Sequence, residues 1–162
     1  MPKVELDQLS DDARIWIFGI SPALDESQSA RVLREVDQFL ADWSAHGAPI
    51  VSGRDLKDGS FLVVGVDRAS ETSGCSIDRM FGTLRRLEQN LGVSILDANR
   101  VFYRDGGKVR VLNRSEFRDR GSSETRVFDT IVERLGDVRS GRWEKRAGES
   151  WHRDLLRQPA TS

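Results

Sequence analysis

Residues 60–67, Ser-Phe-Leu-Val-Val-Gly-Val-Asp, contain the longest apolar run of the chain. Residues 13–20, Ala-Arg-Ile-Trp-Ile-Phe-Gly-Ile, form a similar run, and both are rich in β-branched or aromatic side chains. Short runs of this kind, bounded by polar residues and turn formers, predict β-strands. Because apolar residues follow one another without alternation, we expect both strands to be covered on their two faces.

Two helices are predicted around these strands. In residues 25–45, apolar side chains recur three or four positions apart, and the same spacing in residues 77–91 stops at Gly92. Asp25 or Ser27 is a suitable N-cap for the first helix. Both helices should therefore bury one apolar face.

Two hairpins complete the predicted elements. Asp58-Gly59 lies between residues 50–57 and 60–67, and a second turn at 105–107 lies between 100–104 and 108–112. The order strand, helix, strand, strand, helix, strand is the split βαβ pattern of the ferredoxin-like fold, with one extra hairpin strand. The predicted class is therefore α+β with a ferredoxin-like βαββαβ core.

The prediction places this core in residues 1–113. Residues 114–162 form an irregular or helical C-terminal tail that packs on the same domain and covers the second face of the sheet. A homodimer partner is the alternative cover for that face.

Composition excludes several classes of protein. The chain has 162 residues, a formal net charge of −1 and a single cysteine, so an internal disulfide and a multi-cysteine metal framework are excluded. Spacings such as HExxH and CxxC are absent, and we expect neither a metal nor a cofactor. The apolar runs are too short to cross a membrane and the first residues are acidic, which predicts a soluble, cytoplasmic protein.

One candidate site centres on Cys75, just before the second predicted helix, where a helix dipole favours an anion. The predicted topology brings the end of the first helix, near His46, to the same rim together with Asp67 and Asp78. Cys75 as nucleophile, His46 as base and either aspartate as orienting group would make a catalytic arrangement. The alternative is structural: a cysteine packed in the turn, a histidine complementing the helix dipole and two capping carboxylates.

The same rim is also a candidate ligand-binding or partner surface. Its predicted binding residues are Trp43, Gly74, Ser76, Trp151 and His152. The last two belong to the tail, and the sequence leaves open whether His152 reaches the rim or lies on a surface helix.

A third candidate is the basic tail. Residues 1–99 have 10 basic and 16 acidic side chains, whereas residues 100–162 have 15 and 10. Cations at positions 139, 142, 145 and 146 flank Trp143, a pattern that could contact phosphate and stack on a base. The favoured interpretation is a solvated face that pairs with acidic residues, so no nucleic acid partner is expected.

Five segments carry a family resemblance: RIWI at 14–17, WSAHG at 43–47, VD at 66–67, SGCSID at 73–78 and SW at 150–151. Through them the chain resembles a family of uncharacterised small bacterial proteins, many of which carry the label "ABC transporter ATPase". The resemblance implies a bacterial, cytoplasmic setting and no known reaction. ATP hydrolysis of that class needs a GxxxxGK[ST] loop to cradle phosphates, which this sequence lacks.

The sequence therefore predicts a domain that binds a small molecule or a protein and does not hydrolyse ATP. A thiol-dependent acyl transfer or hydrolysis by Cys75 and His46 is the alternative, and nucleic acid binding through the tail is a weaker one.

Overall fold

The computed structural model describes residues 3–156 of the chain. The chain forms two compact units, one from residues 1–96 and 130–140 and the other from 97–129 and 141–162. Both contain helices and antiparallel sheet, so the predicted α+β class is confirmed. These boundaries differ from the predicted division at 113/114. No helix within residues 3–156 has the length and apolarity needed to span a membrane.

The first unit is built on a three-stranded antiparallel sheet in the order β1 (Arg14–Gly19), β5 (Phe61–Val66), β4 (Ser52–Lys57). Strand β5 lies in the centre, and all six of its residues are buried. The turn between β4 and β5 is the predicted Asp58-Gly59, where both residues have positive φ values of 57° and 64°. Such turns match the twist of paired strands, which explains the tight hairpin.

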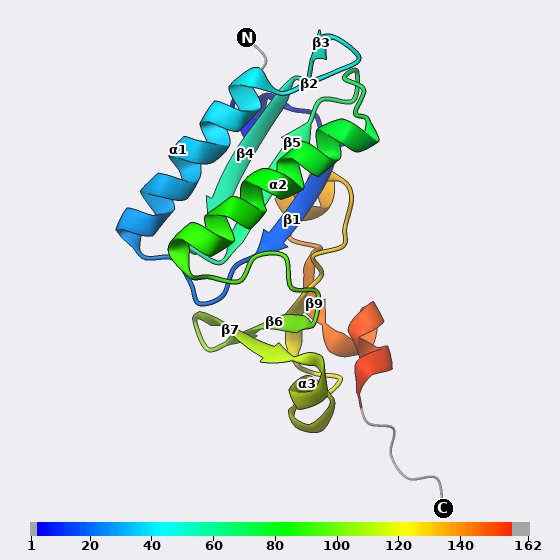
Figure 1. The fold of residues 1–162 in the computed structure, drawn as a ribbon. Helices are drawn as coiled ribbons and strands as arrows, with labels where there is room; N and C mark the ends of the chain where they lie inside the picture. The colour runs from blue at the N-terminus through cyan, green and yellow to red at the C-terminus, as the bar shows by residue number, and fades with distance from the viewer. Residues whose placement is uncertain (1–2, 157–162) are drawn as a thin grey trace, which may run out of the picture. The chain divides into compact units, whose positions relative to one another are not determined.

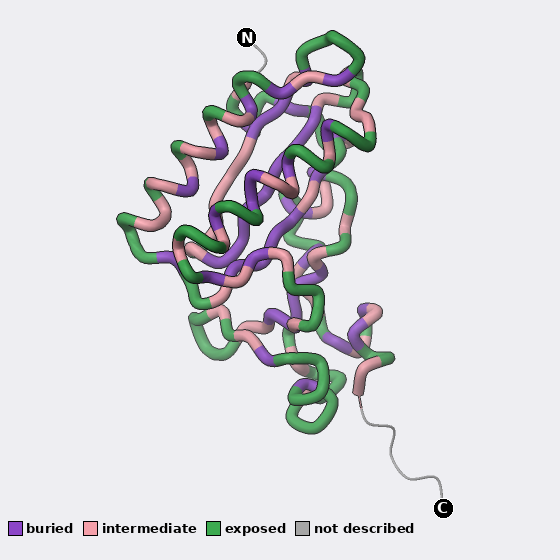
Figure 2. Tube along the Cα trace, in the orientation of Figure 1, coloured by how far each residue is buried: buried purple, intermediate pink, exposed green. Residues whose placement is uncertain are grey.

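Helices α1 (Glu26–Asp42) and α2 (Gly74–Leu91) lie side by side over one face of this sheet (Figure 1). Each begins with a capping box, Asp25 with Gln28 and Ser73 with Ser76, which satisfies backbone N–H groups at the helix start. Their inner faces are buried, as the purple positions in Figure 2 show. The core between helices and sheet includes Val32, Val36, Leu40, Leu62, Val64, Met80, Leu84 and Leu87.

The N-terminal segment packs closely against this sheet. The Val4 N–H donates to the Ser52 carbonyl at 2.8 Å, and the segment continues into a short 3-10 helix, η1 (Leu6–Gln8). A Cβ on Gly53 would lie 2.8 Å from the Val4 carbonyl oxygen and 2.9 Å from the Leu6 nitrogen, both backbone atoms, so glycine is needed for this close approach. From the predicted tail, residues 130–140 add to the outer edge of β1, where the Ile15 N–H donates to the Glu133 carbonyl at 3.0 Å. The sequence does not predict that the N-terminal segment packs on the sheet.

The strand expected to complete a ferredoxin-like sheet lies in the second unit. After α2 the chain makes a single bridge to β1's end, Ser21 to Ser94, and the Glu88 carboxylate then accepts the N–H groups of Ile95 and Leu96 at 2.7 and 2.8 Å. The next strand, β6 (Arg100–Asp105), pairs with β7 (Lys108–Asn113) and β8 (Arg126–Phe128) instead. The predicted four-stranded sheet is therefore corrected to three strands plus a bridge.

The second unit has a four-stranded antiparallel sheet in the order β7-β6-β8-β9, with β9 at Glu144–Arg146. Helix α3 (Arg114–Arg120) and two 3-10 helices, η2 (Ala147–Glu149) and η3 (Trp151–Leu155), accompany it. Its core is formed by Val101, Leu112, Phe117, Val127 and Ala147. These side chains explain why β6 leaves the first sheet: its buried residue Val101 belongs to a separate core. The remaining short elements belong to the first unit: α4 (Leu135–Arg139) and the strands β2 (Ser44–Ala45) and β3 (Ala48–Pro49).

Candidate functional site

The predicted position of His46 in the last turn of the first helix is wrong. Helix α1 ends at Asp42, and His46 lies exposed in the turn of the β2–β3 hairpin, with a φ of 53° beside Gly47 at 77°. The helix ends early because Trp43 takes an extended backbone and its indole N–H donates to the Ser76 carbonyl on α2 at 2.8 Å. Trp43 makes this buried bond instead of continuing α1 by another turn.

Cys75, Asp67 and Asp78 are the other members of the predicted catalytic set, and each has its own surroundings. Cys75 and Asp78 are exposed in the first turns of α2, and Asp67 accepts the Ala69 N–H at 2.8 Å in its own turn. Among the described residues, no hydrogen bond or ion pair joins any two of Cys75, His46, Asp67 and Asp78. Within residues 3–156, the exposed thiol therefore has no hydrogen bond to a base or to an orienting carboxylate.

The predicted binding residues divide between the units. Trp43 and Ser76 are buried and joined by the indole hydrogen bond, and Gly74 is exposed at the start of α2. Trp151 and His152 lie in η3 of the second unit and form part of a cluster there. Of the five, Trp43 lines a cavity in the first unit.

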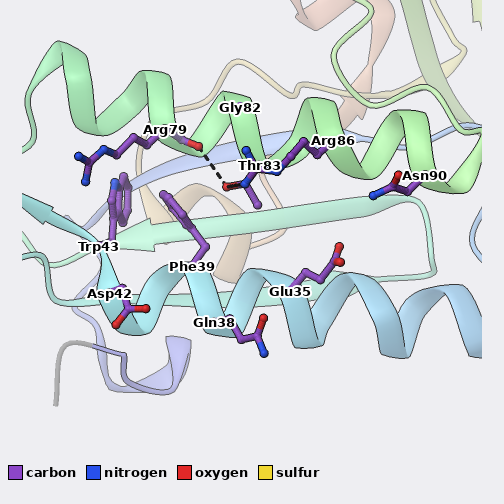
Figure 3. A pocket seen from close by; sticks show the side chains of 10 residues that line it. All are labelled: Glu35, Gln38, Phe39, Asp42, Trp43, Arg79, Gly82, Thr83, Arg86 and Asn90. Atoms are coloured by element: carbon purple, nitrogen blue, oxygen red, sulfur yellow. Dashed lines mark hydrogen bonds between the residues drawn. The ribbon is translucent and has the colours of Figure 1, made fainter.

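That cavity is a groove of about 470 Å³ between α1 and α2. Figure 3 shows the rings of Phe39 and Trp43 in the space between the two helices. Small-molecule sites commonly have volumes of roughly 300–1,000 Å³, and this groove falls within that range. Its lining residues are Glu35, Gln38, Phe39, Asp42 and Trp43 from α1 and its end, and Arg79, Gly82, Thr83, Arg86 and Asn90 from α2.

The apolar part of the groove is a pair of aromatic rings. The centroids of Phe39 and Trp43 lie 5.1 Å apart, and Trp16 packs edge-on against Trp43 at 6.4 Å. Trp43 is only 2% exposed and is fixed by its bond to Ser76. Buried Trp43 therefore backs the half-buried ring of Phe39, and a supported ring of this kind contacts a ligand at little cost in side-chain entropy.

Gly82 makes an opening in the wall formed by α2. It lies in the interior of the helix, where glycine is less favourable than alanine by about 1 kcal/mol. A Cβ built on Gly82 has nothing within 4 Å, so no neighbouring atom requires a glycine at this position. The space that a side chain would take up is the groove itself.

Charged side chains of opposite sign lie on the two walls. Glu35 and Asp42 are seven residues apart on α1, and Arg79 and Arg86 are seven apart on α2, so each pair lies on one helix face. Arg86 donates to the Thr83 hydroxyl at 3.3 Å, and Glu35 pairs with Arg31 at 3.8 Å. In contrast, the Arg79 guanidinium and the Asp42 carboxylate have no ion pair or hydrogen bond within the described part of the chain.

The second unit contains a buried polar cluster around Asp129. Lys145 Nζ and the Trp151 indole N–H each donate to this carboxylate at 3.3 Å, and the Arg114 guanidinium lies over the Trp151 ring at 5.3 Å. His152 stacks on Trp151 at 4.0 Å and bonds to the Ser150 hydroxyl at 2.8 Å. Burial lowers the pKa of His152 from 6.5 to about 4; Asp129 opposes this shift, and the charges of Arg114 and Lys145 add to it. The groups satisfy one another, which is typical of structural clusters.

The basic residues around Trp143 are largely engaged. Arg139 pairs with Asp11 at 3.0 Å, Lys145 with Asp129, and Arg146 with Glu124 and Glu149. Trp143 is 7% exposed and packs on Phe128 with centroids 4.9 Å apart. Its ring is therefore in use within the unit, and the predicted stacking surface for a base is not exposed.

Comparisons of the chain with protein-family models, with curated proteins and with solved structures found no match. Residues 3–156 also contain no group of three or more His, Cys, Asp and Glu side chains that could hold a metal ion. The geometry of the groove is thus the basis on which a function can be argued.

Proposed function

We propose that the protein is a small-molecule-binding domain and that the groove between α1 and α2 is its binding site. The observation that carries this proposal is Gly82, a helix-interior glycine that the surrounding packing does not require and that widens the cavity. Proteins commonly accept a local loss of stability at functional positions. Ligand access is a sufficient reason for a glycine here.

The rest of the groove supports this function. Most of its lining comes from two long helices held by capping boxes and a shared core, so the site is formed before a ligand arrives. Phe39, backed by buried Trp43, offers an apolar surface, and Gln38, Thr83 and Asn90 offer polar atoms nearby. An apolar surface with a few convergent polar groups is the usual composition of a small-molecule site.

The test is to fill the opening without harming the fold. Gly82→Leu should leave the free energy of unfolding unchanged or raise it by up to about 1 kcal/mol, because leucine is the better helix former and has room. Gly74→Leu, in the same helix but outside the groove, is the matched control. A fragment library is screened by amide and indole NMR shifts, with hits defined as compounds that shift Phe39, Trp43 and residue 82.

We expect hits to lose at least tenfold in affinity in Gly82→Leu and to bind Gly74→Leu as they bind the unmodified protein. Failure to obtain any hit at these residues would overturn the proposal. Hits that bind Gly82→Leu with unchanged affinity would overturn it as well, since they would occupy a different surface.

A further inference from the structure

We propose that the groove selects zwitterionic ligands with an apolar body, of the class of aromatic α-amino acids. This inference rests on the proposed function and adds the chemistry of the ligand. It comes from the arrangement of Asp42, Arg79 and the aromatic pair Phe39 and Trp43 at one end of the groove (Figure 3).

The placement of the two charges follows from the helix ends. Asp42 is the last residue of α1, and Arg79 lies near the beginning of α2. The bond from the Trp43 indole to the Ser76 carbonyl joins these two helix ends. An acid and a base are thereby held on opposite walls at the same end of the groove.

These two charges are free to meet a ligand. Neither the Asp42 carboxylate nor the Arg79 guanidinium has a charged or hydrogen-bonding partner among residues 3–156, and the two are too far apart to pair with each other. At the other end, the Arg86–Thr83 and Glu35–Arg31 contacts already engage the charged groups. The head group of a ligand is therefore expected beside Trp43, and its body along the groove towards Gly82.

Opposite charges on facing walls discriminate between ligands. A ligand with only a carboxylate is attracted by Arg79 but repelled by Asp42. A ligand with only an ammonium group is attracted by Asp42 but repelled by Arg79. A molecule with an ammonium and a carboxylate on one carbon can satisfy both walls at once. An aromatic body on the same molecule gains contact with half-buried Phe39, whose ring packs on buried Trp43.

The test uses three probes that share a phenyl ring: L-phenylalanine, 3-phenylpropionate and 2-phenylethylamine. Affinities are measured by titration calorimetry, and the position of binding by the NMR shifts of Phe39 and Trp43. We expect L-phenylalanine to bind at least tenfold more tightly than either singly charged probe. The variants Asp42→Asn and Arg79→Gln then remove one wall charge each.

Asp42→Asn should remove the preference over 3-phenylpropionate, and Arg79→Gln should remove the preference over 2-phenylethylamine. Arg85→Gln is the control, since Arg85 is an exposed arginine of α2 that does not line the groove. It should leave all three affinities unchanged. This crossed pattern would not arise from general destabilisation, which would weaken all probes together.

Two results would overturn the inference. One is equal binding of the three probes in the groove, and the other is an equal loss of affinity for all three probes in both variants, which would leave the selectivity unchanged. If fragments that are sensitive to Gly82→Leu bind but L-phenylalanine does not, the ligand class is wrong and the binding site stands. If sedimentation shows a dimer and Gly82→Leu dissociates it, a second copy of the chain occupies the groove, and both proposals fail.

Discussion

Each unit of the protein contains a tryptophan beside charged side chains, and the two surroundings differ in what the charges do. Trp43 in the first unit donates its indole N–H to a backbone carbonyl, and Asp42 and Arg79 near it pair with no described residue. Trp151 in the second unit donates to the Asp129 carboxylate, which also accepts from Lys145. The charges near Trp43 are thus available at a cavity, whereas those near Trp151 are paired with each other in a cluster.

This difference separates a binding site from a structural element. Unpaired charges beside a rigid aromatic surface cost little while water solvates them, and they can exchange that water for a ligand. Buried charges such as Asp129 must be paired within the fold, because leaving one unpaired costs several kcal/mol. Similar residue types therefore have opposite roles, set by burial and by the partners already present.

The largest expected effect comes from truncating the two tryptophans in parallel. Trp43→Ala should lower the free energy of unfolding of the first unit by about 4 kcal/mol, since the ring is fully buried. Trp151→Ala should cost the second unit about 2 kcal/mol, because that ring is partly exposed and loses one hydrogen bond. Amide hydrogen exchange, measured residue by residue, would assign each loss to its unit.

Trp43→Phe serves as the matched control for the first unit. It keeps an aromatic ring against Phe39 and removes the bond to Ser76, so about 2 kcal/mol should be lost. A larger loss from Trp151→Ala than from Trp43→Ala would contradict the comparison, since it would make Trp151 the more deeply packed ring.

An effect smaller than that of Trp43→Ala is expected from pH, and only in the second unit. Folded His152 has a pKa of about 4, whereas an unfolded histidine titrates near 6.5, so the unfolded state binds more protons between these values. The contribution of neutral His152 to the free energy of unfolding is therefore fully present above pH 6.5. It is lost as the pH is lowered to 4, and this loss is about 3 kcal/mol. Denaturant unfolding at a series of pH values measures this loss.

His152→Gln is the comparison for the pH series, because both proteins share the same carboxylates and the difference between them isolates the histidine. The difference should develop between pH 6.5 and 4, and exchange in the first unit should not follow it. Parallel pH curves for the two proteins would show that His152 is not buried in its neutral form.

The elements with strong local signals were predicted well. The apolar runs at 13–20 and 60–67 contain β1 and β5, and the Asp58-Gly59 turn lies where the sequence placed it. Helical periodicity likewise identified α1 and α2, because the side chains that repeat every three or four residues are the ones these helices bury. These features depend on neighbours in sequence, which a single chain reveals.

Features that depend on distant partners were not predictable in this way. The pattern of residues 100–104 indicates a strand equally well in either sheet, and only the separate core around Val101 decides its partner. The apolar stripe of α1 continues into Trp43, so its periodicity could not show that the indole bond to Ser76 ends the helix at Asp42. Of the groove residues, only Trp43 was predicted, since Asp42 and Arg79 resemble ordinary surface charges until two helices bring them together.

The smallest expected effect is that of Cys75→Ser. Because Cys75 is exposed and has no hydrogen bond to a base or carboxylate in the described part of the chain, the free energy of unfolding should change by less than about 0.5 kcal/mol. L-Phenylalanine affinity should also be unchanged, since the groove does not include this residue.

The rate of alkylation of Cys75 by iodoacetamide should be the same in His46→Ala as in the unmodified protein, because His46 lies in the β2–β3 turn with no bond to the thiol. A several-fold slower alkylation in His46→Ala would instead show that the two side chains act together, and the thiol-dependent reaction would then replace ligand binding as the function to pursue.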